Sequence, residues 1–259
     1  MPPRYYTCWH LHGGLYMVNL LNDKAEPIPV NWWKFPAGEI GCRIEWEGEY
    51  ESFTIGIDKD YSAESIMSAL MLSQAVQDTF DVVPDLVIPY LPYGRQDKIH
   101  YKGEGVSRDM MIKILSPNFE FITIIDSHSP VCGVYNIEVT QEYVLAVMKK
   151  SYTHIVFPDA GAKAKYKFPD YKTVAAVKTR DKATGQITSY KLEEEIPADA
   201  KVLVVDDICD GGRTFLELAK LLPKNRDLFV THGIFSKGIE LIEAQYDTVN
   251  FCTEVTPNV

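Results

Sequence analysis

The segment between residues 202 and 222 holds side chains whose types and spacing suit the binding of a phosphorylated sugar. The hydrophobic run VLVV ends in two adjacent carboxylates, Asp206 and Asp207, and the polar segment DGGRT (210–214) follows before a helical pattern begins. Glycines let the backbone approach an anion closely, and the start of a helix presents unpaired N–H groups to it. Carboxylates at the carboxyl end of a strand suit vicinal sugar hydroxyls or a magnesium ion. No Gly-Lys-Ser/Thr sequence follows, so the segment is not a Walker loop.

Composition and charge limit the class of protein. The 259 residues are 46% hydrophobic and 24% charged, which is typical of a globular protein. The 26 Lys and Arg against 36 Asp and Glu give a net charge of −10, which argues against binding to nucleic acid or to an anionic membrane surface. No apolar run approaches the roughly 20 residues of a membrane helix, and the opening MPPRYYTCWHLHGG lacks a signal-peptide core. The five scattered cysteines predict reduced thiols. We therefore expect a cytoplasmic protein.

The hydrophobic periodicity predicts the elements that must position the carboxylates. Short strands are expected over 15–21 and 42–57, and a 3.6-residue period predicts a helix over 61–80 with Ser62 as its N-cap. Further helices are expected over 107–115, 141–150 and 214–222, and buried strands over 85–91, 119–126, 154–160, 172–178, 201–207 and 227–235. This alternation indicates an α/β protein with mainly parallel sheets flanked by helices. A boundary near 130–145 gives two domains, 1–138 and 139–259.

The segment 202–222 resembles the phosphoribosyl-diphosphate-binding motif of the type I phosphoribosyltransferase fold. Other segments are similar, in the same order, to those of the ribose-phosphate diphosphokinases, also called phosphoribosyl pyrophosphate synthetases. These segments are KFPAGEIGCRIE (34–45), IPYLPYGRQDK (88–98), IIDSHS (124–129), FPDAGAKAK (157–165), VKTRDK (177–182) and THGIFSKGIELIE (231–243). The resemblance implies two similar phosphoribosyltransferase-like domains, a nucleotide-side domain first and a ribose-phosphate-binding domain second.

The same resemblance implies an activity in nucleotide biosynthesis. Such an enzyme transfers diphosphate from ATP to the C1 hydroxyl of ribose 5-phosphate, giving 5-phosphoribosyl 1-diphosphate and AMP, with Mg²⁺ as cofactor. Family members form homo-oligomers, and we expect a dimer or a larger assembly here.

The resemblance also assigns roles to residues by position. The ribose 5-phosphate site would be formed by Asp206, Asp207, Asp210, Gly211, Gly212, Arg213 and Thr214. ATP would be bound by Phe35, Glu39, Arg95, Gln96 and Asp97, with the first two supplied by a neighbouring subunit. His128 and Asp159 would be the magnesium ligands. Lys178 and Arg180 would be the catalytic cations, at the point where strand 172–178 gives way to a mobile loop.

The chain also departs from the family's pattern. Ala37 stands where the family usually has Asp or Asn, which predicts relaxed nucleotide selectivity. The phosphate loop reads Gly-Gly-Arg-Thr rather than Thr-x-Gly-Thr. The altered segment 99–105, together with the chain's ending at TEVTPNV, predicts weak regulation by ADP and phosphate and a smaller assembly.

Two other functions stay open. A phosphoribosyltransferase that consumes the product would explain the phosphate loop, but it would not explain KFPAGEI or YGRQDK. A non-catalytic, regulatory relative of the synthetase is expected to have lost some of the catalytic or metal-binding residues. All of them, namely Lys178, Arg180, His128 and Asp159, are present.

Overall fold

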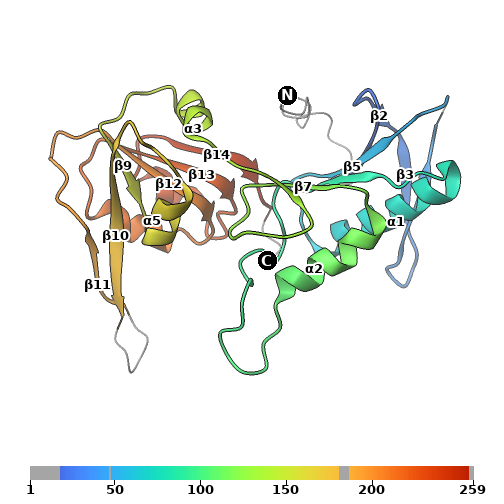
Figure 1. The fold of residues 1–259 in the computed structure, drawn as a ribbon, viewed down its shortest axis with the longest axis horizontal. Coiled ribbons are helices and arrows are strands. Elements are labelled where there is room, and N and C mark those ends of the chain that lie inside the picture. The colour runs from blue at the N-terminus through green and yellow to red at the C-terminus, as the bar shows by residue number, and fades with distance from the viewer. Residues whose placement is uncertain (1–17, 47, 181–186, 257–259) are drawn as a thin grey trace. The chain divides into compact units, whose positions relative to one another are not determined.

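Helices and buried strands alternate along the chain and form two compact units, Met1–Ile137 and Glu138–Pro257 (Figure 1). The computed structural model describes residues 18–46, 48–180 and 187–256, without the side chains of 178–189. The expected boundary after residue 138 lies next to this division. Every helix within the described ranges is too short or too polar to span a bilayer. The α/β class with parallel sheets, expected from the sequence, is confirmed.

The first unit contains a six-stranded sheet in the order β2-β1-β5-β6-β7-β8. Its strands are β1 (Val18–Asn22), β2 (Pro27–Ile28), β5 (Phe53–Ile57), β6 (Asp85–Val87), β7 (Ile122–Ile125) and β8 (Tyr135–Ile137). The strands from β5 to β8 are parallel, and β1 pairs antiparallel with β5. A separate antiparallel pair consists of β3 (Val30–Lys34) and β4 (Ile40–Ile44). The helices are α1 (Ala63–Phe80), α2 (Ser107–Leu115) and the short 3₁₀ helix Ser116–Asn118.

Helix α1 begins and ends where its sequence signals predict. The Ser62 side chain accepts a hydrogen bond from the Ser65 N–H. The Asp60 carboxylate accepts from the hydroxyls of Ser62 and Ser65, at 3.1 and 3.0 Å. This capping satisfies N–H groups that the first helical turn leaves unpaired. The helix ends at Asp81, which is in the left-handed region with φ 57°. The predicted helix and its N-cap are confirmed.

The second unit contains a six-stranded sheet in the order β11-β10-β9-β12-β13-β14. Its strands are β9 (His154–Phe157), β10 (Lys172–Arg180), β11 (Ile187–Leu192), β12 (Val202–Cys209), β13 (Arg226–Gly233) and β14 (Val249–Glu254). All neighbours are parallel except β11, which pairs antiparallel with β10. The helices are α3 (Gln141–Met148), α4 (Ala160–Lys165), α5 (Arg213–Ala219) and α6 (Glu240–Glu243).

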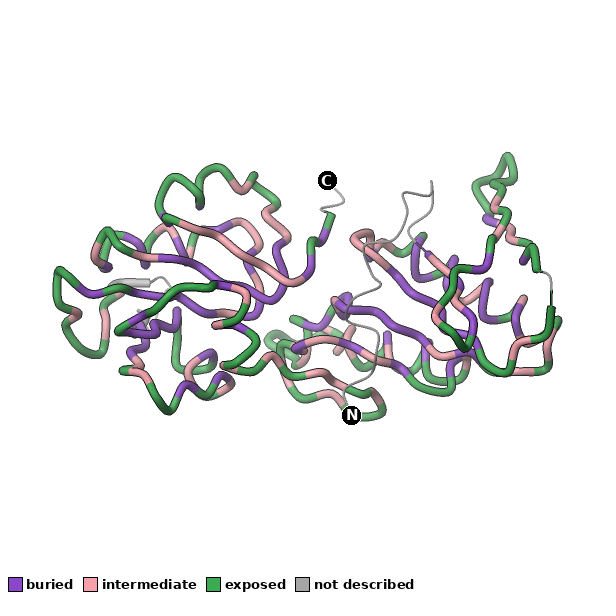
Figure 2. Tube along the Cα trace, turned by 90° about the horizontal axis from the view of Figure 1, so that it is seen from above, coloured by how far each residue is buried: buried purple, intermediate pink, exposed green. Residues whose placement is uncertain are grey.

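Both faces of this second sheet are buried. Val202 and Val204 of β12 belong to a core that includes Phe215 of α5 and Ile242 of α6. Their neighbours Leu203 and Val205 belong to another core with side chains of α3 and α4, among them Val144, Met148 and Ala162. This alternation follows from the two-residue period of a strand. In Figure 2 the buried positions accordingly concentrate along the strands.

Strand β10 corrects one expectation. The sequence predicts that it ends at Lys178, but it extends to Arg180 because β11 pairs with it, and this hairpin projects from the sheet in Figure 1. Residues 179–192 include few apolar side chains. The hydrophobic periodicity therefore predicted neither the extension of β10 to Arg180 nor strand β11. The polar loop expected after Arg180, residues 181–186, lies outside the described residues. The strand expected over 85–91 ends earlier, at Val87, two residues before Pro89.

An ion pair between the buried Asp227 and the exposed Lys150 lies at the edge of the second sheet at which its strands begin. Asp227 of β13 is 3% exposed, and both of its carboxylate oxygens accept from the Lys150 ammonium, at 2.9 and 3.0 Å. The Tyr152 hydroxyl donates to the same carboxylate at 2.9 Å, and Lys150 also donates to Thr248 at 2.6 Å. The Asp227 carboxylate and the Tyr152 hydroxyl, the buried polar groups of this network, therefore each have a partner.

This network predicts a graded loss of stability. Asp227→Ala removes the acceptor of the hydrogen bonds from Lys150 and Tyr152 and should lower the free energy of unfolding by about 2–3 kcal/mol. Tyr152→Phe removes one hydrogen bond and should cost only about 1 kcal/mol. Urea unfolding of both variants measures the difference, and equal losses would contradict the assigned network.

Candidate functional site

Residues that follow neighbouring strands of the second unit meet at one edge of its sheet. Asp159 follows β9, while Asp206 and Asp207 lie near the end of the adjacent strand β12. The chain continues from β9 to β10 on one side and from β12 to β13 on the other, so the strand order reverses between β9 and β12. In open α/β sheets, ligands bind outside the carboxyl ends of the strands at such a switch point. The sheet therefore positions these carboxylates where a ligand is expected.

Several carboxylates lie close together at this edge. The pKa of the Asp206 carboxyl is well above its ordinary value because the group is buried beside the negative charges of Asp207 and Asp159. Asp207 is itself buried and forms an ion pair with Lys165 of α4 at 3.4 Å. The Asp159 side chain caps α4 by accepting from the Ala162 N–H at 3.1 Å. The edge thus attracts cations and hydroxyl groups. Lys165 was not among the predicted site residues.

The two glycines after β12 differ in conformation and in surroundings. Gly212 has φ +72°, and a Cβ added to it would lie 2.5 Å from the Ile242 Cδ1. Gly211 has no such φ, and a Cβ added to it would have the Lys237 Cγ as its nearest neighbour, at 3.6 Å. Gly212 is therefore required by backbone and packing together, whereas Gly211 leaves room next to the loop. Arg213 and Thr214 open α5, and the Arg213 side chain is exposed.

A second loop, residues 234–238, lies against this glycine loop. Its backbone is fixed to the end of β12, because the N–H groups of Ile234 and Phe235 donate to the Cys209 carbonyl at 2.8 and 3.1 Å. The Ser236 hydroxyl donates to the Asp210 carboxylate at 2.6 Å, which orients that carboxylate. Ser236 was not among the predicted site residues, although its segment, residues 231–243, was part of the resemblance.

The β10–β11 hairpin carries the two residues that are expected to be catalytic. Lys178 pairs with Tyr190 in the ladder, and Arg180 pairs with Ile187. The Tyr190 hydroxyl donates to the Pro158 carbonyl at 3.1 Å, next to Asp159. Burial and the negative charges of Asp159 and Asp206 raise the pKa of this phenol. The base of the hairpin is therefore attached to the carboxylate edge.

In the first unit, the expected ATP-binding segment lies beside the expected metal-binding loop. The Ser129 hydroxyl donates to Asp97 and accepts from Arg108 at 2.7 Å. Burial alone would raise the pKa of the Asp97 carboxyl, but the bond from Ser129, its own backbone N–H and the nearby cations lower it. Arg108, which sequence reasoning missed, also donates to the Pro130 carbonyl at 3.2 Å. Arg95, Gln96 and His128 are exposed.

The hairpin β3–β4 carries Phe35 and Glu39 in its turn. The Phe35 N–H donates to the Glu39 carbonyl at 2.8 Å, and the Phe35 side chain is half-exposed. The Trp33 ring lies edge-on to Phe35, with ring centroids 6.2 Å apart, and covers Gly41 on the opposite strand. An aromatic pair thus stands on the exposed end of this hairpin.

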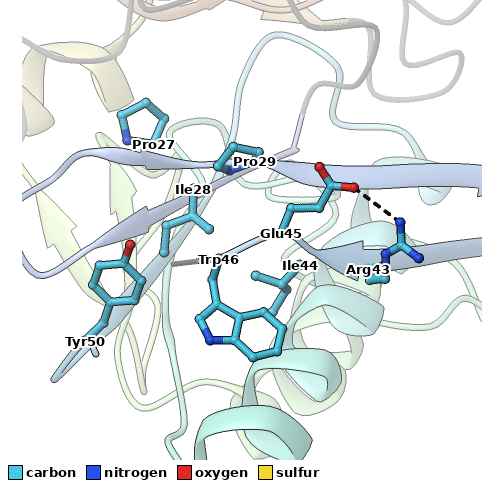
Figure 3. A pocket seen from close by; sticks show the side chains of 8 residues that line it. All are labelled: Pro27, Ile28, Pro29, Arg43, Ile44, Glu45, Trp46 and Tyr50. Carbon is cyan, nitrogen blue, oxygen red and sulfur yellow. Dashed lines mark hydrogen bonds and ion pairs between the residues drawn. The ribbon is translucent and has the colours of Figure 1, made fainter. Parts of the chain in front are cut away.

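A pocket of about 650 Å³ in the first unit is separate from these residues. Figure 3 shows the Ile28 side chain directed toward the rings of Tyr50 and Trp46. Arg43 forms an ion pair with Glu45 at 3.3 Å. Its described lining, which also includes Pro27, Pro29 and Ile44, contains none of the predicted site residues.

The residues around Asp159 fit a magnesium ion that arrives with a substrate. Within the described ranges, no three His, Cys, Asp or Glu side chains converge so as to hold a metal ion by themselves. Mg²⁺ is commonly held by one or two carboxylates together with substrate phosphates and water. The Asp159 and Asp206 carboxylates, which lie close enough for their charges to interact, supply such oxygen ligands. His128 belongs to the other unit.

The glycine loop predicts a sharp contrast between two neighbouring substitutions. Gly212→Ala places a side chain in the left-handed region and against Ile242, which should cost about 2–4 kcal/mol of unfolding free energy. Gly211→Ala meets only ordinary contacts and should change stability by less than about 1 kcal/mol. Chemical denaturation of the two variants tests this contrast. A tolerated Gly212→Ala would show that the loop geometry is not as described.

Comparisons with known proteins agree with this arrangement. The phosphoribosyl transferase domain family matches residues 163–230. The ribose-phosphate pyrophosphokinase of Pyrococcus abyssi is 27% identical over 247 residues, covering 87% of this chain and 84% of the relative. The protein of the same name from Pyrococcus furiosus is 28% identical over 249 residues, covering 87% and 85%.

A solved structure supports the fold. The crystal structure of phosphoribosylpyrophosphate synthetase from Mycobacterium smegmatis matches with a TM-score of 0.74 at 20% identity, covering 91% of this chain and 84% of that one. The resemblance stated from the sequence motifs is confirmed. The chain is therefore similar in sequence to ribose-phosphate pyrophosphokinases over most of its length, and its fold is that of a phosphoribosylpyrophosphate synthetase.

Proposed function

We propose that this chain is a ribose-phosphate diphosphokinase, which transfers diphosphate from ATP to the C1 hydroxyl of ribose 5-phosphate and releases AMP. One observation carries the proposal: carboxylates and a glycine loop occupy the carboxyl edge of the second sheet at its switch point. A phosphorylated pentose carries the two groups that this edge complements, hydroxyls for carboxylates and a phosphate for the loop.

The sugar is held by two sets of groups. Asp206, Asp207 and Asp210 accept hydrogen bonds from the ribose hydroxyls, with Asp210 oriented by Ser236. Backbone N–H groups of the glycine loop and the Thr214 hydroxyl hold the 5-phosphate. This binding fixes the position of the C1 hydroxyl, which must attack in line with the leaving AMP.

ATP is bound by residues of the first unit. Arg95 and Gln96 contact the phosphates and the base, and the segment that contains them is held by the contacts of Asp97 and Arg108 with Ser129. Phe35 and Glu39, at the exposed end of their hairpin, act in the site of a neighbouring copy of the chain. Asp159 and His128 would hold Mg²⁺, which would supply neutralisation of charge on the diphosphate.

Lys178 and Arg180 stabilise the charge that develops on the transferred group. Phosphoryl-type transfer leaves the protein mainly the tasks of positioning and charge neutralisation, for which two cations on one strand are suited. Their strand is attached to the carboxylate edge through Tyr190.

The direct test is a mixture of the purified protein with Mg²⁺, ATP and ribose 5-phosphate. AMP should form only when the sugar phosphate and Mg²⁺ are both present. A folded protein that forms no AMP would contradict the proposal and favour a non-catalytic relative. Release of diphosphate from 5-phosphoribosyl 1-diphosphate and a nucleobase would instead indicate a phosphoribosyltransferase.

The catalytic assignment gives a separate prediction. Lys178→Ala and Arg180→Ala should each lower turnover by about 10²–10³, because each removes charge stabilisation that exists only in the transition state. Affinity for ATP and ribose 5-phosphate should change only a few fold. Steady-state kinetics at saturating substrates measure this effect, and near-normal turnover in both variants would remove the strand from the mechanism.

Lys191→Ala is the matched control for these two variants. Lys191 lies on the same hairpin, opposite Val177, and is exposed. Its loss changes the net charge equally and should leave turnover unchanged.

A further inference from the structure

The loop 234–238 brings a lysine to the glycine loop. Phe235 has φ 46°, and the Gly238 N–H donates to the Phe235 carbonyl at 2.8 Å, which closes a turn with Ser236 and Lys237 at its centre. This turn is fixed to the end of β12 at Cys209 and to Asp210 through Ser236. The position of Lys237 is therefore set by the same strand end that carries the candidate sugar site.

The Lys237 side chain runs past Gly211. Its Cγ and Cε lie 3.6 and 3.9 Å from the position that a Cβ of Gly211 would take. Within the described part of the chain, its ammonium group forms no hydrogen bond or ion pair, and the residue is exposed. A lysine can lay its aliphatic stem along the backbone and keep its charged end in water. The ammonium is thus available to an anion at the loop.

An anionic ligand at this edge would be repelled by the nearby carboxylates unless cations also contact it. Lys165 is paired with Asp207, and Asp206, Asp207 and Asp210 all lie within the segment that would bind the sugar. A phosphate monoester carries between one and two negative charges near neutral pH. Arg213 and Lys237 are the cations that the glycine loop and its neighbouring loop add to the site.

This arrangement also explains a departure found in the sequence. The chain has Gly211 where the resemblance leads one to expect a hydroxyl-bearing residue. The Lys237 stem lies in van der Waals range of the position that a Gly211 side chain would take, so the second loop offers a cation beside a position where the first lacks a hydroxyl.

We propose that Lys237 binds the phosphate group of the sugar substrate at the glycine loop and so favours phosphorylated over unphosphorylated pentoses. The inference rests on the proposed function, because it assumes that this loop receives the phosphate of ribose 5-phosphate. A charge-assisted hydrogen bond to phosphate depends on the ammonium and not on the packing of the lysine stem.

The experiment compares Lys237→Met, which keeps the stem, with Lys237→Arg, which keeps the charge. Calorimetric titration with ribose 5-phosphate should give a Kd about 10- to 100-fold weaker for Lys237→Met and within about threefold of the native value for Lys237→Arg. The affinity for ATP should stay unchanged in both variants. Lys224→Met is the control, since Lys224 is exposed and precedes β13, at the opposite edge of the sheet.

Two results would overturn the inference. One is an unchanged affinity of Lys237→Met for ribose 5-phosphate, and the other is an equal loss in Lys224→Met. If the native chain does not bind ribose 5-phosphate, the same comparison of variants is made by titration with inorganic phosphate. A native chain that binds neither ribose 5-phosphate nor inorganic phosphate also overturns the inference. Absence of AMP formation alongside a Lys237-dependent affinity would reject the proposed function and leave the phosphate contact standing.

Discussion

The convergence of like charges at the ends of β9 and β12 is the constraint on which the candidate site depends. Asp159 and Asp206 come from neighbouring parallel strands, whose carboxyl ends meet at one edge of the sheet. Burial makes this proximity costly, which is visible in the raised pKa of Asp206. The arrangement is held by two apolar cores, one on each face of β12. Packing away from the site thus offsets repulsion within it.

The two edges of the same sheet treat buried charge in opposite ways. At the edge where the strands begin, Asp227 is matched by Lys150 and Tyr152, so its charge is satisfied within the protein. At the edge where they end, Lys165 pairs with Asp207, while partial burial and the negative charges of Asp207 and Asp159 raise the pKa of the Asp206 carboxyl. The first edge adds stability, and the second keeps affinity for cations and hydroxyl groups. Perturbed pKa values of this kind are a common mark of functional sites.

Local signals were sufficient to predict some elements and some site residues. The period of 61–80 and its Ser62 cap gave α1, and the expected helix 107–115 coincides with α2, because these helices depend on nearby residues. The segment 206–214 was recognisable for the same reason. Lys165, Ser236 and Arg108 were missed because their contacts join residues 42, 26 and 21 positions apart. Strand β11 was missed because its partner, rather than its own apolar pattern, determines it.

The two sheets also differ in a way that assigns them different tasks. From β5 to β8 the strand order of the first unit advances in one direction, so its parallel strands have no switch point comparable to that between β9 and β12. Among the described parallel strands, such a switch point is therefore found in the second unit. The first unit offers its candidate residues on loops and on a separate hairpin, held by contacts such as Arg108–Ser129 and Trp33–Phe35. Loops adjust to a ligand more readily than strand ends do. We infer that the strand ends of the second unit offer the more rigid of the two sets of candidate residues.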